Sequence, residues 1–410
     1  MPVQEISWEV FDQFANQADH RSFEQSSEMG YLLEKRGYQV KPIGYIDEQN
    51  QVQVAGILYS TPVAGGLYSE IHYGPVYQDQ QFLKPFLEGL KSFAKQNNTI
   101  ELAVKPYDSY QNYDDNGCEI STPNQALLSI FEEAGYTFQG LTTGFKSSDW
   151  HYVKSLAGID SKHLRNHFSK KGKALIKKAN TFGITIRQLQ REELDLFKQV
   201  TSATSDRRDY DDKPLEYYQY LYDGFKDKAK FLVASLNFKD YLDHLNKDQA
   251  KLTAKIAKLE ADLAQNPNSD KKRNQHREFS SQSATFDTRK AEANDFITKY
   301  GTQDVILAAS LFIQMPQETT YFFSGSYPEF NKFYAPALLQ EYIMADSIDK
   351  AIPNYNLLGV EGTFDGSDGI LRFKQNFNGY IERRPGSFNY YPKPLKYQFY
   401  HILKKILRRH

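Results

Sequence analysis

The chain has 410 residues, of which 40% are hydrophobic and 25% are charged, and its formal net charge at pH 7 is −1. This length is too great for one hydrophobic core and predicts two or three domains. The balanced charge removes any global argument for nucleic-acid binding, so local charge must carry such a prediction. One cysteine, Cys118, excludes an internal disulfide framework and fits a reducing compartment.

Several function classes find no support in the sequence. No apolar run approaches the length of a membrane span, and the N-terminus lacks a signal pattern, so we expect a cytoplasmic protein. There is no Cys/His cluster, no P-loop and no G-x-S-x-G motif, and we therefore expect no metal and no cofactor. His151, His163 and His167 fit no metal-binding helix spacing, and we interpret them as solvated or phosphate-facing.

The first part of the chain predicts one mixed α/β unit of ordinary domain size. Two helices are expected within residues 6–36, the second over 28–36 and ended by Gly37. Tyr107, Tyr110 and Tyr113 fall in a loop after a strand. The further strands and helices follow from alternating and helical apolar spacing: strands over 40–46, 51–60, 69–77, 100–104 and 136–148, and helices over 82–93 and 123–134.

The segment 161–187 is the most strongly basic part of the chain, with no acidic residue in it. We expect a helix here, anchored on one face by Leu164, Phe168, Leu175 and Ile176. A run of cations without acids exceeds what a balanced surface needs and favours polyanion binding. The cations that we expect to contact a polyanion are Arg165, Lys170, Lys171, Lys173, Lys177, Lys178 and Arg187.

The tract 205–222 places Arg207 and Arg208 ahead of a tyrosine-rich helix that contains Tyr217 and Tyr218. Arginine suits bidentate phosphate recognition, and tyrosine hydroxyls add donors. A local Arg–Asp network that caps the helix explains the same residues equally well.

Residues 241–300 predict an antiparallel helical hairpin that interrupts the second half of the chain. Six apolar residues, with Gln249 in the one gap, follow alternating three- and four-residue steps, which is a heptad seam: Leu242, Leu245, Leu252, Ile256, Leu259 and Leu263. Phe279, Phe286 and Ala293 supply a partner stripe after a turn at 265–269. Lys271, Lys272 and Arg273 would suit phosphate contacts, and a solvated charge run fits them as well.

The second half repeats the order strand, strand, helix, strand: strands over 305–313 and 319–324, a helix over 334–347 and a strand over 356–360. Leu338, Leu339, Tyr342 and Ile343 are expected on the buried face of that helix. Two copies of one unit are the simplest account, and a cleft between the copies is the default binding site.

The stretch 355–383 reads as a strand, a loop rich in Gly and Asp, a helical turn with Phe373 and Lys374, and a last strand. Lys374 lies between Phe373 and Phe377, and a lysine held by two rings can present a fixed positive charge to a developing oxyanion. The alternative is that both rings are core and Lys374 is solvated.

The C-terminus predicts an amphipathic basic helix. Tyr397, Phe399, Ile402 and Ile406 alternate with five cations: Lys396, Lys404, Lys405, Arg408 and Arg409. Such a helix suits an anionic membrane surface, or it docks on the first domain with a cationic outer face.

Together these pieces resemble the FemABX family of aminoacyltransferases, in particular its FemA/MurM/MurN-like members, across essentially the whole chain. The resemblance is carried by a duplicated unit, the inserted hairpin and five motifs: QSSEMGYLLEKRGYQV, YGPV, AGYTFQGLTTGF, RDYDDKPLEYY and NLLGVEGTFDGSDGILRFKQNF. The last of these is fairly specific.

The resemblance implies an α/β (α+β) fold with two GNAT-like subdomains. The first covers 1–152, the second covers 153–240 and 301–410 with a C-terminal basic helix that returns to the first, and 241–300 is the coiled-coil hairpin. It implies transfer of an amino acid, alanine or serine, from alanyl- or seryl-tRNA to the stem-peptide lysine of peptidoglycan, or to its first bridge residue. The acceptor would be lipid II or another muropeptide precursor at the inner face of the cytoplasmic membrane, with only peripheral membrane contact.

By motif, Lys374 would stabilise the oxyanion or the tRNA terminus, and the basic residues of 161–178 and of the hairpin turn would contact tRNA. The remaining site residues would bind substrate: Arg208 with Tyr217 or Tyr218 at the precursor's phosphates, Tyr321 and Phe323 along the cleft, and Lys35, Arg36, Tyr107 and Phe373 around it.

The chain departs from the family pattern at Leu33, Tyr73 and Lys105, where relatives place a lysine, an arginine and an aspartate. These departures suggest an unusual acceptor, such as a stem that already carries one residue. An acetyl-CoA-dependent N-acetyltransferase is disfavoured, because no R/Q-x-x-G-x-G/A loop is found. A non-catalytic RNA- or membrane-binding scaffold is the alternative from a different class.

Overall fold

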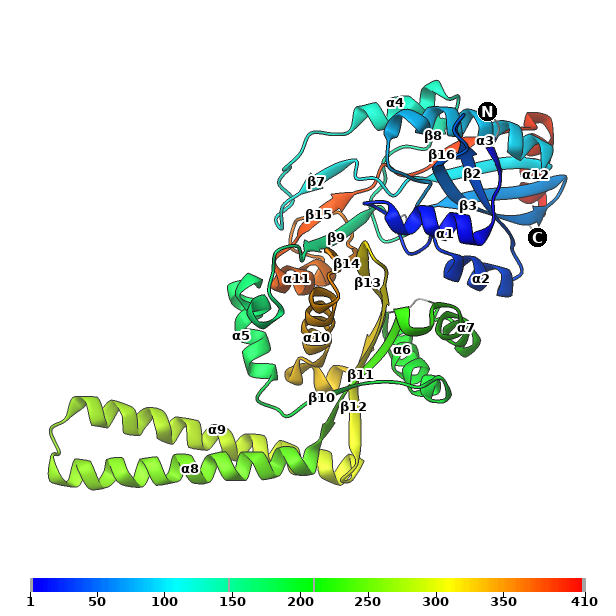
Figure 1. Cartoon of the computed structure of the whole chain (residues 1–410). Coiled ribbons are helices and arrows are strands. Elements are labelled where there is room, and N and C mark those ends of the chain that lie inside the picture. The colour runs from blue at the N-terminus through cyan, green and yellow to red at the C-terminus, as the bar shows by residue number, and fades with distance from the viewer. Residues whose placement is uncertain (1–2, 147, 209–210, 408–410) are drawn as a thin grey trace.

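In the computed structural model, two mixed α/β units lie side by side, and a long pair of helices protrudes from one of them (Figure 1). The structure describes residues 3–146, 148–208 and 211–407. The predicted mixed α/β architecture with an inserted helical hairpin is confirmed. Asp209 and Tyr210 of the RDYDDKPLEYY motif, and Arg408 and Arg409, lie outside the described residues.

The first sheet has the strand order β1-β2-β3-β4-β6-β16-β8, and β5 pairs with β3 beside this path. Its strands are β1 (Val3–Glu5), β2 (Gln39–Ile46), β3 (Val52–Val63), β4 (Gly66–His72), β5 (Val76–Tyr77), β6 (Thr99–Lys105), β8 (Thr137–Phe138) and β16 (Phe388–Tyr390).

The second sheet has the order β10-β11-β12-β13-β14-β9-β15-β7. Its strands are β7 (Gln111–Tyr113), β9 (Trp150–Ser155), β10 (Thr185–Gln188), β11 (Ala229–Asn237), β12 (Asp304–Gln314), β13 (Glu318–Ser326), β14 (Asn354–Gly359) and β15 (Tyr380–Arg383).

The repeated plan predicted from the sequence is present in both sheets. In the first, β3 and β4 are antiparallel. β4 and β6 are parallel neighbours, and the chain connects them through helix α3 (Leu83–Gln96). In the second, β12 and β13 are antiparallel. β13 and β14 are parallel neighbours, and the chain connects them through helix α10 (Ala335–Asp349). A parallel pair needs such a crossover, and it is usually helical.

Each half of the chain also gives a strand to the sheet of the other half. β7 comes from the first half and pairs with β15 at the edge of the second sheet. β16 comes from near the C-terminus and lies between β6 and β8 in the first sheet. β9, which spans the boundary expected at residue 152, lies wholly in the second sheet. The two units are therefore tied together by backbone pairing.

Helices cover both sheets and form many of the connections between strands. The other helices are α1 (Trp8–Gln17), α2 (Ser27–Lys35), α4 (Gln125–Glu133), α5 (Lys170–Ala179), α6 (Leu194–Arg208), α7 (Leu215–Phe225), α8 (Phe238–Gln265), α9 (Asp270–Tyr300), α11 (Gly369–Lys374) and α12 (Pro394–Leu407). Short 3₁₀ helices are η1 (Gln80–Phe82), η2 (Ser161–His167), η3 (Arg191–Glu193), η4 (Lys226–Lys228), η5 (Pro328–Phe333) and η6 (Gln375–Phe377).

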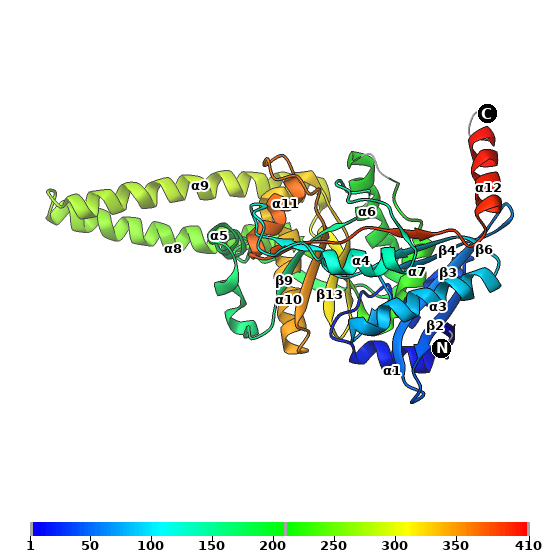
Figure 2. The ribbon, with the colours of Figure 1, turned by 90° about the horizontal axis from the view of Figure 1, so that it is seen from above.

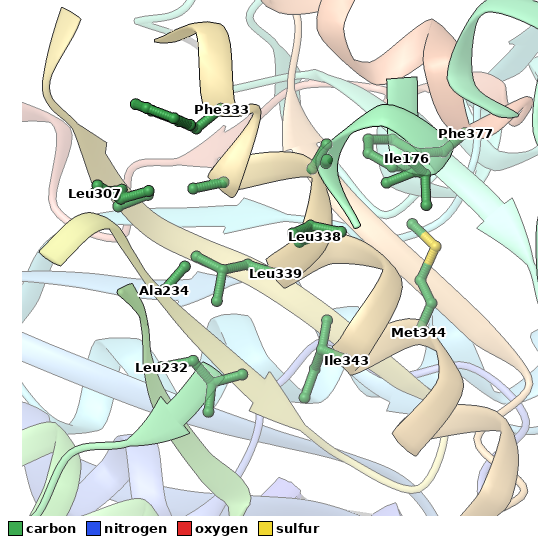
Figure 3. Close-up of a cluster of buried hydrophobic side chains, with 14 of the residues drawn as sticks. Ile176, Leu232, Ala234, Leu307, Phe333, Leu338, Leu339, Ile343, Met344 and Phe377 are labelled. Carbon is green, nitrogen blue, oxygen red and sulfur yellow. The ribbon is translucent and has the colours of Figure 1, made fainter. Parts of the chain in front are cut away.

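One hydrophobic core of the second unit lies between its sheet and α10, and another lies on the opposite face under α6 and α7. Leu338, Leu339 and Ile343 of α10 are buried with Leu232 of β11 and Leu307 of β12 (Figure 3). Burying one such side chain contributes about 1.5–3 kcal/mol, so this layer holds α10 firmly and with it the crossover to β14. Tyr342, predicted on the buried face, is 49% exposed and lines a groove between α10 and η2 instead.

The helical hairpin has the predicted heptad stripe of apolar residues and the predicted turn. α8 ends at Gln265 and α9 begins at Asp270, and Leu245, Leu252 and Ala293 are buried between or beneath the two helices. Gln249, which fills the gap in the seam, donates to Asp287 at 2.7 Å and accepts from Lys290 at 2.8 Å. The hairpin and α12 lie at opposite ends of the molecule (Figures 1 and 2).

Three predicted elements are wrong. The strand expected over 69–77 is interrupted, because β4 ends at His72 and β5 begins at Val76. The strand expected over 136–148 is only Thr137–Phe138, because Gly140 and Gly144 adopt positive φ angles of 87° and 90° that interrupt an extended strand. The helix expected over 161–187 is divided into η2, α5 and β10, and Ser169 caps the start of α5 through its hydroxyl. In the part of the chain that the structure describes, no helix is both long and apolar enough to cross a membrane.

Candidate functional site

A series of buried polar side chains crosses the boundary between the two sheets. Tyr107, which follows β6, donates its hydroxyl to Glu318 of β13 at 2.6 Å and accepts from the Asn356 amide of β14 at 2.7 Å. Nδ1 of His151, in β9, lies 3.2 Å from that amide nitrogen, and its Nε2 lies 3.2 Å from the Tyr73 hydroxyl. We call these five residues the seam network. Because unpaired buried polar groups are costly, the network fixes how the two units meet.

Buried charges surround the seam network. Arg384, which follows β15, places its guanidinium 3.9 Å from the centre of the Tyr107 ring and 2.8 Å from Glu382. Burial raises the pKa of Glu318. Burial, reinforced by the charge of Arg384, holds the pKa of His151 well below its usual range. His151 is therefore neutral, with Nδ1 assigned as the acceptor of the Asn356 amide hydrogen.

Lys374 is the last residue of α11, and its side chain reaches the end of β14. Its side chain is buried, and Nζ donates to the carbonyl oxygens of Leu358 at 2.9 Å and Gly359 at 2.6 Å. Successive carbonyls of an extended strand point to opposite edges, so both reach one ammonium only because the strand is distorted here. Leu358 has a positive φ of 58°, a costly conformation that persists where the surroundings enforce it and that is common at functional sites.

Burial lowers the pKa of Lys374 to about 7, and the charge of Asp368 opposes part of that shift. Asp368 is held at the start of α11, where it accepts from the backbone N–H groups of Ile370 and Leu371. A lysine with this pKa gains and loses its proton near neutral pH, so it can serve as a cation or as a proton acceptor. The two carbonyl oxygens that bind Nζ belong to Leu358 and Gly359, which follow Asn356 of the seam network in β14.

The sequence predicted that Phe373 and Phe377 hold the Lys374 ammonium between them. In the structure they do not. The two rings contact each other edge to face at 5.5 Å, and Phe377 packs into the core against Phe168 at 5.4 Å. Lys374 points away from them because neighbouring helical positions face different directions. The alternative of a solvated Lys374 is wrong as well, since the residue is 3% exposed.

Three predicted residues meet where α2, α7 and β13 approach one another. The guanidinium carbon of Arg36 lies 5.4 Å from the centre of the Tyr38 ring and 5.5 Å from that of Tyr217. Tyr217 in turn contacts the ring of Phe323 at 6.0 Å. We call these four residues the Arg36 cluster. Arg36 is exposed, and a guanidinium supported by aromatic rings keeps its donors open for a phosphate or carboxylate.

The other residues predicted to bind substrate are not members of the Arg36 cluster, although the Tyr218 ring contacts those of Tyr217 at 5.9 Å and Phe323 at 5.5 Å. Tyr218 is buried, and its hydroxyl donates to Asp212 at 2.7 Å, so it is part of the core and not a phosphate donor. Lys35 is exposed, with its ammonium 5.4 Å from the centre of the Tyr31 ring. Arg208 is exposed at the last position of α6.

Tyr321 and Phe323 do not line one surface. A register shift in β13, opposite Leu311 and Phe312, breaks the alternation between them. Tyr321 stacks on Phe312 at 5.4 Å against the α10 side of the sheet, and Phe323 packs on the opposite side, which α6 and α7 cover.

The predicted tRNA-binding lysines of α5 share one exposed helix. Lys170, Lys171, Lys173, Lys177 and Lys178 are all exposed, and α5 contains no acidic residue. A dense positive surface of this kind attracts polyanions, and its contribution to binding falls as salt rises.

The other predicted tRNA-binding cations are largely paired within the protein. Arg165 binds Glu341 of α10 through two nitrogens, one of them at 3.0 Å. At the hairpin turn, Lys272 pairs with Asp262 at 3.0 Å and Arg273 with Asp270 at 2.6 Å, while Lys271 is exposed. The α5 surface is therefore the stronger candidate for phosphate contacts.

A small cavity opens beside the seam network. It has a volume of about 200 Å³ and is lined by Tyr73 and Tyr107 together with His20, Tyr77 and Asp108. A larger groove of about 640 Å³ lies between η2 and α10, away from Lys374.

Most of the seam network cannot be recognised from local sequence patterns. His151 was interpreted as solvated or phosphate-facing, and it is fully buried. Glu318, Asn356 and Tyr73 were not assigned to a site. The signal for Asn356 is its place in the otherwise apolar stretch NLLG, because a buried amide is retained in a strand only where it has partners.

Comparison with known proteins gives one consistent result. A sequence model described as the FemAB family matches residues 6–405. Aminoacyltransferase FemB of Staphylococcus epidermidis is 26% identical over 415 residues, covering 99% of both chains. Aminoacyltransferase FemA of the same species is 26% identical over 421 residues, covering 99% of this chain and 100% of that one. The crystal structure of FemX has the same fold, with a TM-score of 0.77 and 18% identity over 97% of this chain and 99% of that one.

Proposed function

The chain belongs to the FemAB family and is an aminoacyltransferase of that family, and we propose that it transfers alanine or serine from alanyl- or seryl-tRNA to a peptidoglycan precursor. The acceptor is the side-chain amine of the stem-peptide lysine, or the amine of the first bridge residue, of lipid II or another muropeptide precursor. The observation that carries this proposal is Lys374, a buried lysine with a pKa near 7 whose side chain reaches the end of β14.

The α5 surface supports a tRNA donor. Its five exposed lysines stand in the second unit, the same unit that holds Lys374 at the end of β14. An aminoacyl ester is already activated, so transfer needs no further energy source. The enzyme's task is to position the amine and stabilise the charge that develops.

The Arg36 cluster supports an acceptor that carries phosphates. Arg36 comes from the first unit, and Tyr217 and Phe323 come from the second, so a phosphate bound there would bridge the two. Arg208 is exposed and extends the positive charge from the end of α6. Bidentate guanidinium–phosphate contacts are strong and directional.

The proposed step balances without a further reactant. The neutral acceptor amine attacks the ester carbonyl, so that a C–N bond forms and the carbonyl oxygen becomes an oxyanion. The C–O bond to the tRNA ribose then breaks, and the ribose oxygen receives the proton that the amine nitrogen loses.

Lys374 contributes the positive charge to this step. A protonated lysine has three N–H donors, and two of them bind the carbonyls of Leu358 and Gly359. The third is left for an anion. Because an approaching negative charge favours the protonated form, the oxyanion or the tRNA terminus would itself raise the pKa of Lys374 and strengthen the contact.

The three residues that depart from the family pattern make contacts within the protein. Lys105 pairs with Asp149 at 2.8 Å in a buried position, Tyr73 belongs to the seam network, and Leu33 is core. These side chains are therefore committed within the protein, which supports an acceptor different from an unmodified stem. A stem that already carries one residue meets this requirement.

The test is a transfer assay with the purified protein, tRNA charged with labelled alanine or serine, and lipid II with or without a first bridge residue. The proposal expects one labelled residue to join one of these acceptors. Transfer only to the pre-extended acceptor identifies a second-residue enzyme, and transfer to unmodified lipid II identifies a first-residue enzyme. Binding of tRNA without any transfer would contradict the proposal and favour a scaffold.

The same proposal places the enzyme on the cytoplasmic side of the membrane, with peripheral contact only, because lipid II is anchored there by its lipid.

A further inference from the structure

Helix α12 carries an exposed apolar stripe. Leu395, Phe399 and Ile402 are 82%, 60% and 57% exposed. They occupy positions i, i+4 and i+7, which at about 100° per residue fall within an arc of about 60° on one side of the helix. Of the seven large apolar side chains that are exposed in the described part of the chain, three lie in this one stripe. Scattered apolar residues need no explanation, but a row on one helix face does.

The opposite face of α12 attaches the helix to the body. Tyr397 contacts Tyr391, which lies before the helix, at 4.1 Å, and the helix packs near β6. Burial raises the pKa of Glu101 in β6, and the charges of His401 and Lys404 oppose that shift. With this face held, the stripe faces outward, and the helix projects from the first unit at the end opposite the hairpin (Figure 2).

Lysines flank the stripe on both sides. Measured from Leu395, Lys396 lies at about +100° and Lys405 at about −80° around the helix. Both are exposed, and α12 has no acidic residue. The outer face is thus an apolar ridge between two cations, which differs from the uniformly cationic face that a merely docked helix would show.

We propose that α12 is a membrane-docking helix that seats Leu395, Phe399 and Ile402 among the acyl chains of an anionic bilayer. The ammonium groups of Lys396 and Lys405 then reach the headgroup phosphates on either side of the buried ridge. Apolar insertion combined with flanking cations is how interfacial helices bind anionic surfaces. The inference rests on the proposed function only in that a lipid-linked acceptor requires the enzyme to work at a bilayer.

A second copy of the chain is a poorer occupant of this stripe. Stable protein interfaces use about 20–30 residues on each side, and three side chains on one projecting helix fall far short of that. Two stripes meeting face to face would also bring Lys396 and Lys405 of both copies together, and like charges repel.

The test is co-sedimentation of the full-length protein with vesicles, without tRNA or acceptor. One vesicle preparation is phosphatidylcholine alone and the other contains phosphatidylglycerol as well. We expect binding to the anionic vesicles that weakens with salt. The variant Leu395→Ser/Phe399→Ser/Ile402→Ser should lose at least about tenfold in vesicle partitioning, because the inserted apolar surface is gone. Lys396→Ala/Lys405→Ala should bind anionic vesicles less and show a smaller salt effect.

The matched control is Val10→Ser/Ile120→Ser/Phe145→Ser, which removes three exposed apolar side chains elsewhere and should bind as the wild type does. The proposal is overturned if the wild type ignores anionic vesicles, or if the α12 triple variant binds them equally well. It is also overturned if the wild type is a dimer in sedimentation velocity and the triple variant is a monomer, because a second copy then covers the stripe.

This test separates the inference from the proposed function. The α12 triple variant should transfer to a soluble muropeptide acceptor at the wild-type rate, because α12 is remote from Lys374. Loss of vesicle binding with transfer intact leaves the proposed function standing. Vesicle binding by a protein that transfers nothing would remove the proposed function alone.

Discussion

The hydroxyl of Tyr107 and the carboxylate of Glu318, 211 residues apart in the chain, are joined by a buried hydrogen bond of 2.6 Å between the two sheets. Tyr107 also accepts from Asn356, two residues before Leu358, whose carbonyl binds Lys374. The same contact that joins the units therefore also positions the strand end that holds the candidate catalytic lysine.

Replacing Tyr107 with Phe should lower the free energy of unfolding by about 1–3 kcal/mol, because it removes the hydrogen bonds of 2.6 Å and 2.7 Å that the hydroxyl makes with the buried Glu318 carboxylate and the buried Asn356 amide. Tyr136→Phe is the matched control. Tyr136 is equally buried, but it donates to the helical carbonyl of Leu87, so its loss should cost only about 0.5–1.5 kcal/mol. Denaturant unfolding measures both, and a Tyr107→Phe variant no less stable than Tyr136→Phe would contradict the role of the seam network.

Lys374 should make stability rise with pH above neutrality. Its pKa is about 7 in the folded protein and about 10.4 in an unfolded chain. Between these values the unfolded state binds the extra proton, so the penalty for burying the charge, complete below the folded pKa, is relieved as pH rises. From about pH 7 to about pH 9 the wild type should gain about 2 kcal/mol of unfolding free energy relative to Lys374→Met. If the unfolding free energies of the two proteins change with pH in parallel, folding does not lower the pKa of Lys374, and this prediction is contradicted.

Arg36 and Lys35 are neighbours in sequence, but only Arg36 lies in the Arg36 cluster. Arg36→Ala should raise the KM for the acceptor about tenfold or more with little change in kcat, as expected when one charge-assisted phosphate contact is lost. Lys35→Ala should leave the KM near that of the wild type. Equal effects of the two substitutions in steady-state kinetics would remove the cluster from the acceptor site.

The α5 surface should govern the salt dependence of tRNA binding. Replacing its five lysines with alanine should weaken binding and make the plot of log affinity against log salt shallower, by about 0.7–0.9 for each phosphate contact removed. Lys84→Ala/Lys95→Ala, on α3 of the first unit, is the control and should leave the slope unchanged. If the variant with all five lysines replaced keeps the wild-type slope in filter binding or anisotropy, tRNA contacts the protein elsewhere.

The sequence predicted those features that are encoded locally. The heptad spacing from Leu242 to Leu263 gave the hairpin and its turn, because a seam of that period has few alternative structures. The repeated order of strands and helices gave the two parallel crossovers at α3 and α10. The basic character of α5 was also visible, although the break at Ser169 was not recognised.

Features that depend on distant partners were beyond local patterns. The exchange of β7 and β16 pairs residues from opposite ends of the chain, which no periodicity records. Lys374 was singled out by its motif, but its direction depends on the left-handed turn at Leu358. His151 could not be recognised as buried, because its partners Asn356 and Tyr73 each come from another part of the fold.

The single-turnover rate of aminoacyl transfer by Lys374→Met, at saturating aminoacyl-tRNA and acceptor, tests the central role of Lys374 most directly. Arg372→Met, an exposed cation on the same short helix, is the control. We predict that Lys374→Met binds both substrates but transfers at least about 100-fold more slowly, the loss expected when one oxyanion-stabilising group is removed, while Arg372→Met keeps the wild-type rate. A folded Lys374→Met variant that transfers at the wild-type rate would contradict this role and move the reacting centre away from the end of β14.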